Sequence, residues 1–171
     1  YMEDTKLGNY FKSAHYADEA LGELFVQLED SGLLDDTVVV IYGDHDARIS
    51  RKEYDYMYNY DKETDSKLDD DDPNYKEYDS YQYELGRKVP FIIWTKDMAG
   101  TDLNFEVKNV MGMYDVMPTL GNMLGFYNKY QLGHDIFNIK NDNIVVFPTG
   151  NWVTNDLYYN SQKGEYYSIT E

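Results

Sequence analysis

At residues 38–45 the chain reads VVVIYGDH. Five consecutive apolar or aromatic residues, three of them Val, predict a strand that is buried on both faces. Gly43 then permits a sharp turn of the backbone, and a carboxylate and an imidazole follow directly. Because ligands in open α/β sheets bind just beyond the carboxyl ends of the strands, we expect Asp44 and His45 to lie at a binding site.

These two side chains are suited to a divalent ion such as Mn or Zn, because Asp offers hard oxygens and His a neutral ring nitrogen. A metal site normally needs about three or four protein ligands. The chain contains no HxxxH, HExxH or Cys pair that would supply the others. The alternative is that Asp44 caps the next turn and His45 only packs, and the dipeptide by itself leaves both interpretations open.

The composition limits the classes of partner. The 171 residues suit one domain or a large piece of one, and they carry 32 acidic against 15 basic side chains, for a net charge of −17. Such a charge repels nucleic acid and anionic membrane surfaces, so an anionic substrate would require a local positive charge such as a bound cation. The chain has no Cys, no apolar run of the roughly 18–20 residues that span a bilayer, and no signal-peptide pattern. Its abrupt opening into a helix is more typical of a segment cut from a longer protein.

An amphipathic helix is predicted before the central strand, from about residue 9 to Asp30, with Gly32 ending it. Helix followed by strand indicates an α/β fold. The apolar positions that should form the buried face of this helix are Phe11, Ala14, Ala17, Leu21, Leu24 and Leu28.

The segment 54–83 differs from the rest, because it is rich in Tyr and Asp and has almost no aliphatic side chains. We expect a capping box at Ser50 and Glu53 to start a short helix. Residues 54–83 should then form a solvated, acidic insertion or a long surface loop.

A second apolar strand is predicted at residues 89–94, followed by a helix from an N-cap at Asp115 to Gly125. The buried face of that helix should consist of Met117, Leu120 and Leu124. Residues 144–171 should form a small antiparallel unit that closes with a strand over residues 165–169. His134–Asp135 is a second carboxylate–imidazole pair, which we interpret as loop packing.

Six motifs in this order resemble the lipoteichoic acid synthase branch of the sulfatase/alkaline phosphatase superfamily. They cover nearly the whole chain apart from the acidic insertion, and their shared order makes the resemblance specific. The motifs are NYFKSAHYADEA at 9–20, IYGDH at 41–45, VPF at 89–91, YDVMPTL at 114–120, GHDIF at 133–137 and GNWVT at 150–154.

The resemblance implies that residues 1–171 are the C-terminal segment of a sulfatase-like catalytic domain. The expected fold is the corresponding part of an alkaline-phosphatase-like sandwich, with a mixed, mostly parallel sheet and flanking helices. In the branch that this chain resembles, the metal is typically Mn, with Mg, Zn or Ca as alternatives. A Glu, a Thr nucleophile and an Asp–His pair hold it, and that pair matches Asp44 and His45.

The same resemblance places the Glu and the nucleophile before the first helix, so no catalytic nucleophile is expected in this chain. We therefore expect this chain to be inactive by itself and to have the upstream half of its own catalytic domain as its partner. The implied activity is transfer of glycerophosphate from a phosphoglycerol lipid by a membrane-anchored, outward-facing enzyme. The alternatives are a sulfatase or other phosphoester or sulfoester hydrolase, and a non-catalytic extracellular binding module.

The chain departs from the branch directly after His45. There the branch continues with an aromatic residue and Gly-Ile-Ser, whereas this chain has Asp46-Ala47-Arg48-Ile49-Ser50. Arg48 is a candidate for binding an anionic substrate group, because a guanidinium forks onto phosphate oxygens. Alternatively, Arg48 pairs with Asp46 or Asp44 and holds the loop.

Overall fold

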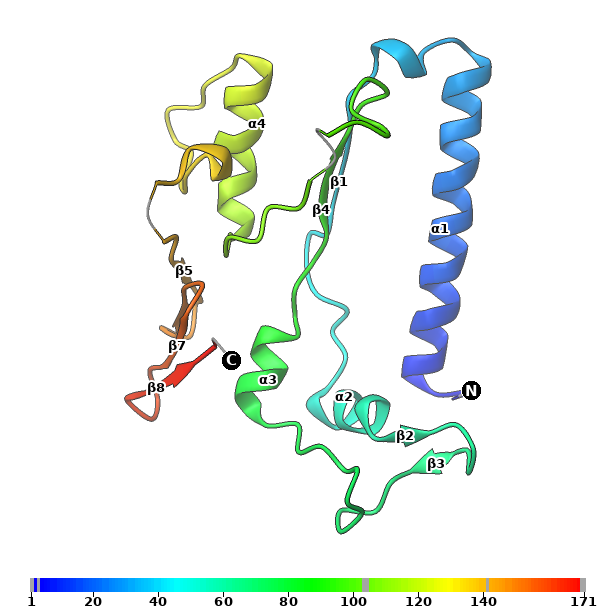
Figure 1. Cartoon of the computed structure of the whole chain (residues 1–171), viewed down its shortest axis with the longest axis vertical. Coiled ribbons are helices and arrows are strands. Elements are labelled where there is room, and N and C mark those ends of the chain that lie inside the picture. Colours follow the sequence, from blue (N-terminus) through cyan, green and yellow to red (C-terminus); the bar gives the residue numbers. More distant parts are fainter. Residues whose placement is uncertain (1, 3, 103–104, 141, 170–171) are drawn as a thin grey trace. The chain divides into compact units, whose positions relative to one another are not determined.

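The computed structural model describes residues 2, 4–102, 105–140 and 142–169, and it divides into two compact units, Tyr1–Asn104 and Phe105–Glu171 (Figure 1). The first unit holds the elements from α1 to β4 and the second those from η2 to β8. The mixture of helices and strands agrees with the predicted α/β class, although the sheets within this chain are small.

The first helix, α1, runs over Lys6–Asp30 and begins three residues earlier than predicted. Thr5 caps it, because its hydroxyl accepts a hydrogen bond from the Gly8 N–H at 2.9 Å. Gly32 follows in the left-handed conformation, with φ of +70°, as the sequence predicts.

The predicted apolar face of α1 is largely exposed within the first unit. Phe11 and Leu24 are 45% and 46% exposed. Phe25 packs edge-on against Trp94 of β4 with ring centroids 4.9 Å apart, and α1 runs alongside the strands there (Figure 1). The rest of the first unit therefore leaves most of this face uncovered.

A short 3₁₀ helix, η1 (Leu34–Asp36), connects α1 to β1 (Val39–Tyr42). This strand pairs with β4 (Phe91–Trp94), and the two run antiparallel. The expectation of a mostly parallel sheet is wrong for the described part of the chain, where every strand pair is antiparallel. The physical reason lies in how the chain returns: the Gly43 N–H, directly after β1, donates to the carbonyl oxygen of Pro90, directly before β4, so β4 enters the pair antiparallel to β1.

The segment between these two strands is ordered, in contrast to the surface loop that its composition predicts. It contains α2 (Arg51–Tyr58), a short hairpin of β2 (Tyr60–Asp61) and β3 (Ser66–Lys67), and α3 (Ser80–Leu85). The predicted capping box at the start of α2 is confirmed.

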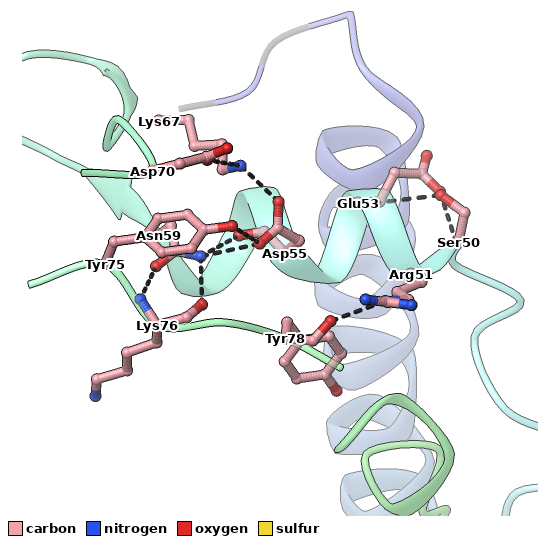
Figure 2. A network of polar contacts seen from close by, with 10 residues as sticks. All are labelled: Ser50, Arg51, Glu53, Asp55, Asn59, Lys67, Asp70, Tyr75, Lys76 and Tyr78. Carbon is pink, nitrogen blue, oxygen red and sulfur yellow. Dashed lines mark hydrogen bonds and ion pairs between the residues drawn. The ribbon is translucent and has the colours of Figure 1, made fainter. Parts of the chain in front are cut away.

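A polar network centred on Asn59 explains this order (Figure 2). Asn59 is 1% exposed, and its side chain bonds both to the Lys76 carbonyl oxygen at 2.9 Å and to the Lys76 N–H at 2.7 Å. The neighbouring Asp55 carboxylate accepts hydrogen bonds from Lys67 Nζ at 2.6 Å and the Tyr75 hydroxyl at 2.9 Å. Burial would raise the pKa of the Asp55 carboxyl, but these hydrogen bonds outweigh that effect and hold the pKa below its usual value.

The second unit begins with η2 (Met113–Asp115) and α4 (Val116–Leu124), and Gly125 ends α4 in the left-handed conformation as predicted. The predicted buried face of α4 is wrong at Met117 and Leu124, which are 42% and 52% exposed. The buried positions of α4 are Pro118, Thr119 and Gly121.

After η3 (Ile136–Asn138), the chain forms a four-stranded antiparallel sheet in the order β5-β6-β7-β8. The strands are Val145–Val146, Trp152–Val153, Leu157–Asn160 and Glu165–Ser168. Tyr158 is 1% exposed and is the largest fully buried side chain on the described residues. The closing strand expected over 165–169 is observed as β8.

Candidate metal-binding site

Asp44 and His45 follow the carboxyl end of β1, at the place that the sequence predicts. The carboxylate Oδ1 of Asp44 lies 3.6 Å from Nε2 of His45, and the two side chains are 83% and 49% exposed. Two ligands of one ion, with bonds of about 2.1 Å at a tetrahedral angle, lie about 3.4 Å apart. The pair therefore has a spacing that suits a shared divalent ion.

A backbone carbonyl oxygen lies within hydrogen-bond distance of the His45 ring. Its Nδ1 lies 2.7 Å from the carbonyl oxygen of Asp46. A carbonyl oxygen can only accept, so Nδ1 is the donor in this contact. In the neutral form of the ring, the lone pair is then on Nε2. A backbone carbonyl on the second ring nitrogen is the usual support of a metal-bound histidine.

The pair fits half of a metal site. Among the residues that the structure describes, no group of three or more His, Cys, Asp or Glu side chains is placed to hold an ion.

Asp46 follows His45 directly, and its carboxylate is held by two hydrogen bonds. Its carboxylate accepts hydrogen bonds from Nη2 of Arg87 at 3.0 Å and from the Arg48 N–H at 3.2 Å, and the side chain is 10% exposed. The hydrogen bond from Arg87 holds the pKa of the Asp46 carboxyl below its usual value, although burial opposes it. Asp46 is thus an ion-pair residue next to the candidate ligands.

Arg48 stands in the left-handed region with φ of +50°. Its carbonyl oxygen accepts a hydrogen bond from Nζ of Lys6 at 2.6 Å. Its guanidinium forms no ion pair with Asp46 or Asp44 among the residues described, and Arg87 forms the ion pair with Asp46 instead. Arg48 does contact Asp46, but through its backbone N–H, which donates to Oδ2 at 3.2 Å. The exposed guanidinium lies three residues beyond His45.

In the second unit, His134 and Asp135 line a hollow of about 600 Å³. Asp135 caps η3, because its carboxylate accepts a hydrogen bond from the Phe137 N–H at 3.1 Å. The backbone N–H of His134 donates to Oδ1 of Asp115 at 2.8 Å. These contacts agree with the interpretation of this pair as loop packing.

The sulfatase family profile matches residues 2–126. The chain belongs to the sulfatase family. Lipoteichoic acid synthase 1 of Bacillus subtilis is 32% identical over 170 residues, covering 95% of this chain and 24% of the relative. Lipoteichoic acid synthases of Staphylococcus saprophyticus and Staphylococcus aureus are 31% and 30% identical over 158 residues, covering 91% of this chain and 22% of each relative.

These similarities place the chain in the lipoteichoic acid synthase-like branch of the sulfatase/alkaline phosphatase superfamily. The chain spans about a quarter of the length of these relatives.

Sequence reasoning missed the residues that support the loop. Arg87 and Tyr83 lie about 40 residues beyond Asp46. Tyr83 ends the segment 54–83, whose composition suggested solvent, and Arg87 lies just beyond that segment. The signal that could have found them was the departure at Asp46, because a half-buried carboxylate requires a cation or several N–H donors.

Proposed function

We propose that this chain supplies Asp44 and His45 to the metal site of a phosphoglycerol transferase that resembles lipoteichoic acid synthase. The observation that carries the proposal is the His45 imidazole, whose Nδ1–H is held by the Asp46 carbonyl oxygen and whose Nε2 lies 3.6 Å from the Asp44 carboxylate. Relatives named lipoteichoic acid synthase match 95% and 91% of the chain, which supports the proposal. Arg48 is the residue of this chain proposed to bind an anionic substrate group.

The proposed ion is divalent, with Mn as the first candidate and Mg, Zn or Ca as alternatives. Asp44 would bind it through a carboxylate oxygen and His45 through Nε2. When bound, such an ion supplies positive charge that offsets the phosphoryl oxygens and lowers the pKa of a nucleophile. Because the chain carries a net charge of −17, this local positive charge would also make an anionic substrate acceptable.

The remaining ligands and the nucleophile are proposed to lie in an upstream half of the same catalytic domain. The exposed apolar positions of α1, such as Phe11 and Leu24 at 45% and 46% exposure, support this, since a large exposed apolar face indicates a partner. This chain by itself is then expected to turn over no substrate.

The intact protein is proposed to be membrane-anchored with its catalytic domain facing outward. Within the described part of the chain, none of the helices is both long and apolar enough to cross a bilayer. The anchor is accordingly proposed to lie outside these residues. The donor substrate would be a lipid that carries glycerophosphate.

The test is Mn²⁺ titration calorimetry on the intact protein with His45→Ala and Asp44→Ala. Both variants should bind Mn²⁺ at least tenfold more weakly and lose glycerophosphate transfer from phosphatidylglycerol vesicles. The melting temperature of the metal-free protein should change little, because both side chains are exposed. His15→Ala is the matched control, since that histidine is 75% exposed on α1 and contacts only Glu19 among the described side chains.

Wild-type Mn²⁺ affinity and activity in His45→Ala would show that the ligand assignment is wrong. Cleavage of an aryl sulfate, without transfer from phosphatidylglycerol, would instead favour the sulfoester hydrolase. Both reactions are expected to depend on Asp44 and His45, so the choice of substrate separates these two functions.

A further inference from the structure

The segment 43–51, which carries Asp44 and His45, forms hydrogen bonds with residues 78–90 at several points. In the sheet, Val39 lies opposite Trp94 and Tyr42 opposite Phe91. The same antiparallel register continues beyond the strands, because the Gly43 N–H donates to the Pro90 carbonyl oxygen at 3.0 Å.

Beyond Gly43, side-chain hydrogen bonds connect the same two segments. Asp46 contacts Arg87 at 3.0 Å, and the Ile49 carbonyl oxygen accepts from the Tyr83 hydroxyl at 2.9 Å. One step further, Nε of Arg51 donates to the carbonyl oxygen of Tyr78 at 2.8 Å (Figure 2). The segment that returns from the acidic insertion therefore extends the β1–β4 ladder past the candidate metal pair.

Asp46 connects this ladder to the imidazole. Arg87 donates to one oxygen of the Asp46 carboxylate, and the Arg48 N–H donates to the other. The carbonyl oxygen of Asp46 lies against Nδ1 of His45. Because the side chain and the carbonyl belong to one residue, fixing the carboxylate restricts the direction of the carbonyl. Arg87 is thereby connected to the His45 ring through the single residue Asp46.

Arg87 is itself supported by the insertion. Its guanidinium lies over the Tyr83 ring at 5.8 Å from the centroid, and Tyr83 contacts Tyr54 edge-on at 5.6 Å. Tyr54 in turn stacks on Tyr78, which is 8% exposed. Tyr83, Tyr54 and Tyr78 thus form a chain of ring contacts that leads from Arg87 to a buried tyrosine.

We propose that Asp46 and Arg87 are positioning residues that present Nε2 of His45 to the metal ion, and that the insertion serves to hold Arg87 in place. This inference rests on the proposed function, since it assumes that His45 is a ligand. Loss of a residue that orients a metal ligand typically weakens metal binding about 10–100-fold.

The test compares Arg87→Ala, Arg87→Lys and Lys88→Ala in the intact protein, with Mn²⁺ alone as the probe in titration calorimetry. Arg87→Ala should weaken Mn²⁺ binding about tenfold. Arg87→Lys should restore part of the affinity, because it keeps the charge but loses the forked geometry. Lys88→Ala removes the same charge one residue away, from an exposed side chain with no hydrogen bond or ion pair to any residue in the described ranges, and should bind like the wild type.

A second measurement uses the metal-free protein. The ¹⁵N shifts of the His45 ring should report the Nδ1–H tautomer in the wild type and a mixture of tautomers in Arg87→Ala. Exchange of the Arg48 amide proton should also become faster in Arg87→Ala, because its acceptor on Asp46 is released. A merely structural ion pair would change the exchange rate but not the tautomer.

The proposal is overturned if Arg87→Ala binds Mn²⁺ within twofold of the wild type while His45→Ala loses binding. It is equally overturned if the tautomer of His45 is unchanged. If the wild type and His45→Ala bind Mn²⁺ equally, the proposed function is wrong, and the tautomer measurement still decides whether Arg87 orients the ring.

Discussion

Replacement of Asp115 should destabilise the second unit more than any exposed substitution there, because its carboxylate joins three separate segments. Asp115 is 0% exposed. The carboxylate accepts from the Gly112 N–H at 2.7 Å, the His134 N–H at 2.8 Å and Nδ2 of Asn143 at 3.1 Å. The sequence predicts this residue as the N-cap of α4, and it has that position, but its side chain makes no capping bond there.

The magnitude follows from these three bonds. A hydrogen bond to a charged group contributes about 1.5 kcal/mol at the low end of its range, so the sum is about 4–5 kcal/mol. Releasing a buried charge offsets part of this loss, which leaves about 3 kcal/mol for Asp115→Ala. Asp115→Asn should cost about 2 kcal/mol, because its amide NH₂ faces at least one N–H donor in either orientation.

The assay is urea unfolding of the intact protein together with amide hydrogen exchange of Gly112 and His134. Asp156→Ala is the control, because Asp156 is exposed and its carboxylate makes no hydrogen bond to the residues that the structure describes. If Asp115→Ala were within 1 kcal/mol of the control and the His134 amide stayed protected, the carboxylate would not hold these segments together.

Gly133→Ala tests the same contact from the opposite side. Gly133 has φ of +81°, and a Cβ there would clash with Oδ1 of Asp115 and lie 2.7 Å from the Tyr114 carbonyl oxygen. Gly125 has a similar φ of +74° but no atom within 4 Å of that position. Gly125→Ala should therefore show only the backbone cost of about 1 kcal/mol, and Gly133→Ala should lose clearly more stability. Equal losses would mean that the Asp115 contact is not tight.

Two further predictions concern the insertion. Burial raises the pKa of the Tyr78 phenol to about 12, above its unfolded value of about 10, so its stabilising effect is complete below pH 10 and is lost between pH 10 and 12. Phenolate absorbance should show a Tyr that titrates near pH 12 and that Tyr78→Phe removes. Titration of every Tyr near pH 10 would contradict this. Asn59→Ala should cost about 2–3 kcal/mol and speed exchange of the Lys76 amide, whereas Asn74→Ala, at an exposed position of the same segment, should leave the exchange rate of the Lys76 amide unchanged.

Local signals in the sequence predicted local structure well. The capping box at Ser50, the end of α1 before Gly32 and the end of α4 at Gly125 depend on neighbours within four residues, and all three are observed. The candidate pair Asp44–His45 was placed by the same kind of signal, a strand followed by Gly.

The features that sequence reasoning missed depend on residues far apart along the chain. The buried Asn59 side chain is satisfied by hydrogen bonds with the Lys76 backbone. The Asp46 carboxylate is held by Arg87. From composition, residues 54–83 were predicted to be solvated. Composition gives the number of polar groups but not which of them form hydrogen bonds with one another. The apolar face of α1 was predicted as core, but periodicity reports only that a face is apolar and not what covers it.

The register across the loop explains how two paired strands tolerate roughly 50 residues between them. Loop closure costs about 0.6 kcal/mol for each doubling of length. Extending a connection from about 10 to about 50 residues therefore costs about 1.4 kcal/mol. Each cross-contact of the ladder, such as Asp46–Arg87 or Ile49–Tyr83, contributes about 1 kcal/mol net. Two such contacts offset the entropy of the insertion, and because both bonds end on the loop that follows His45, the stabilisation is placed where the candidate ligand is held.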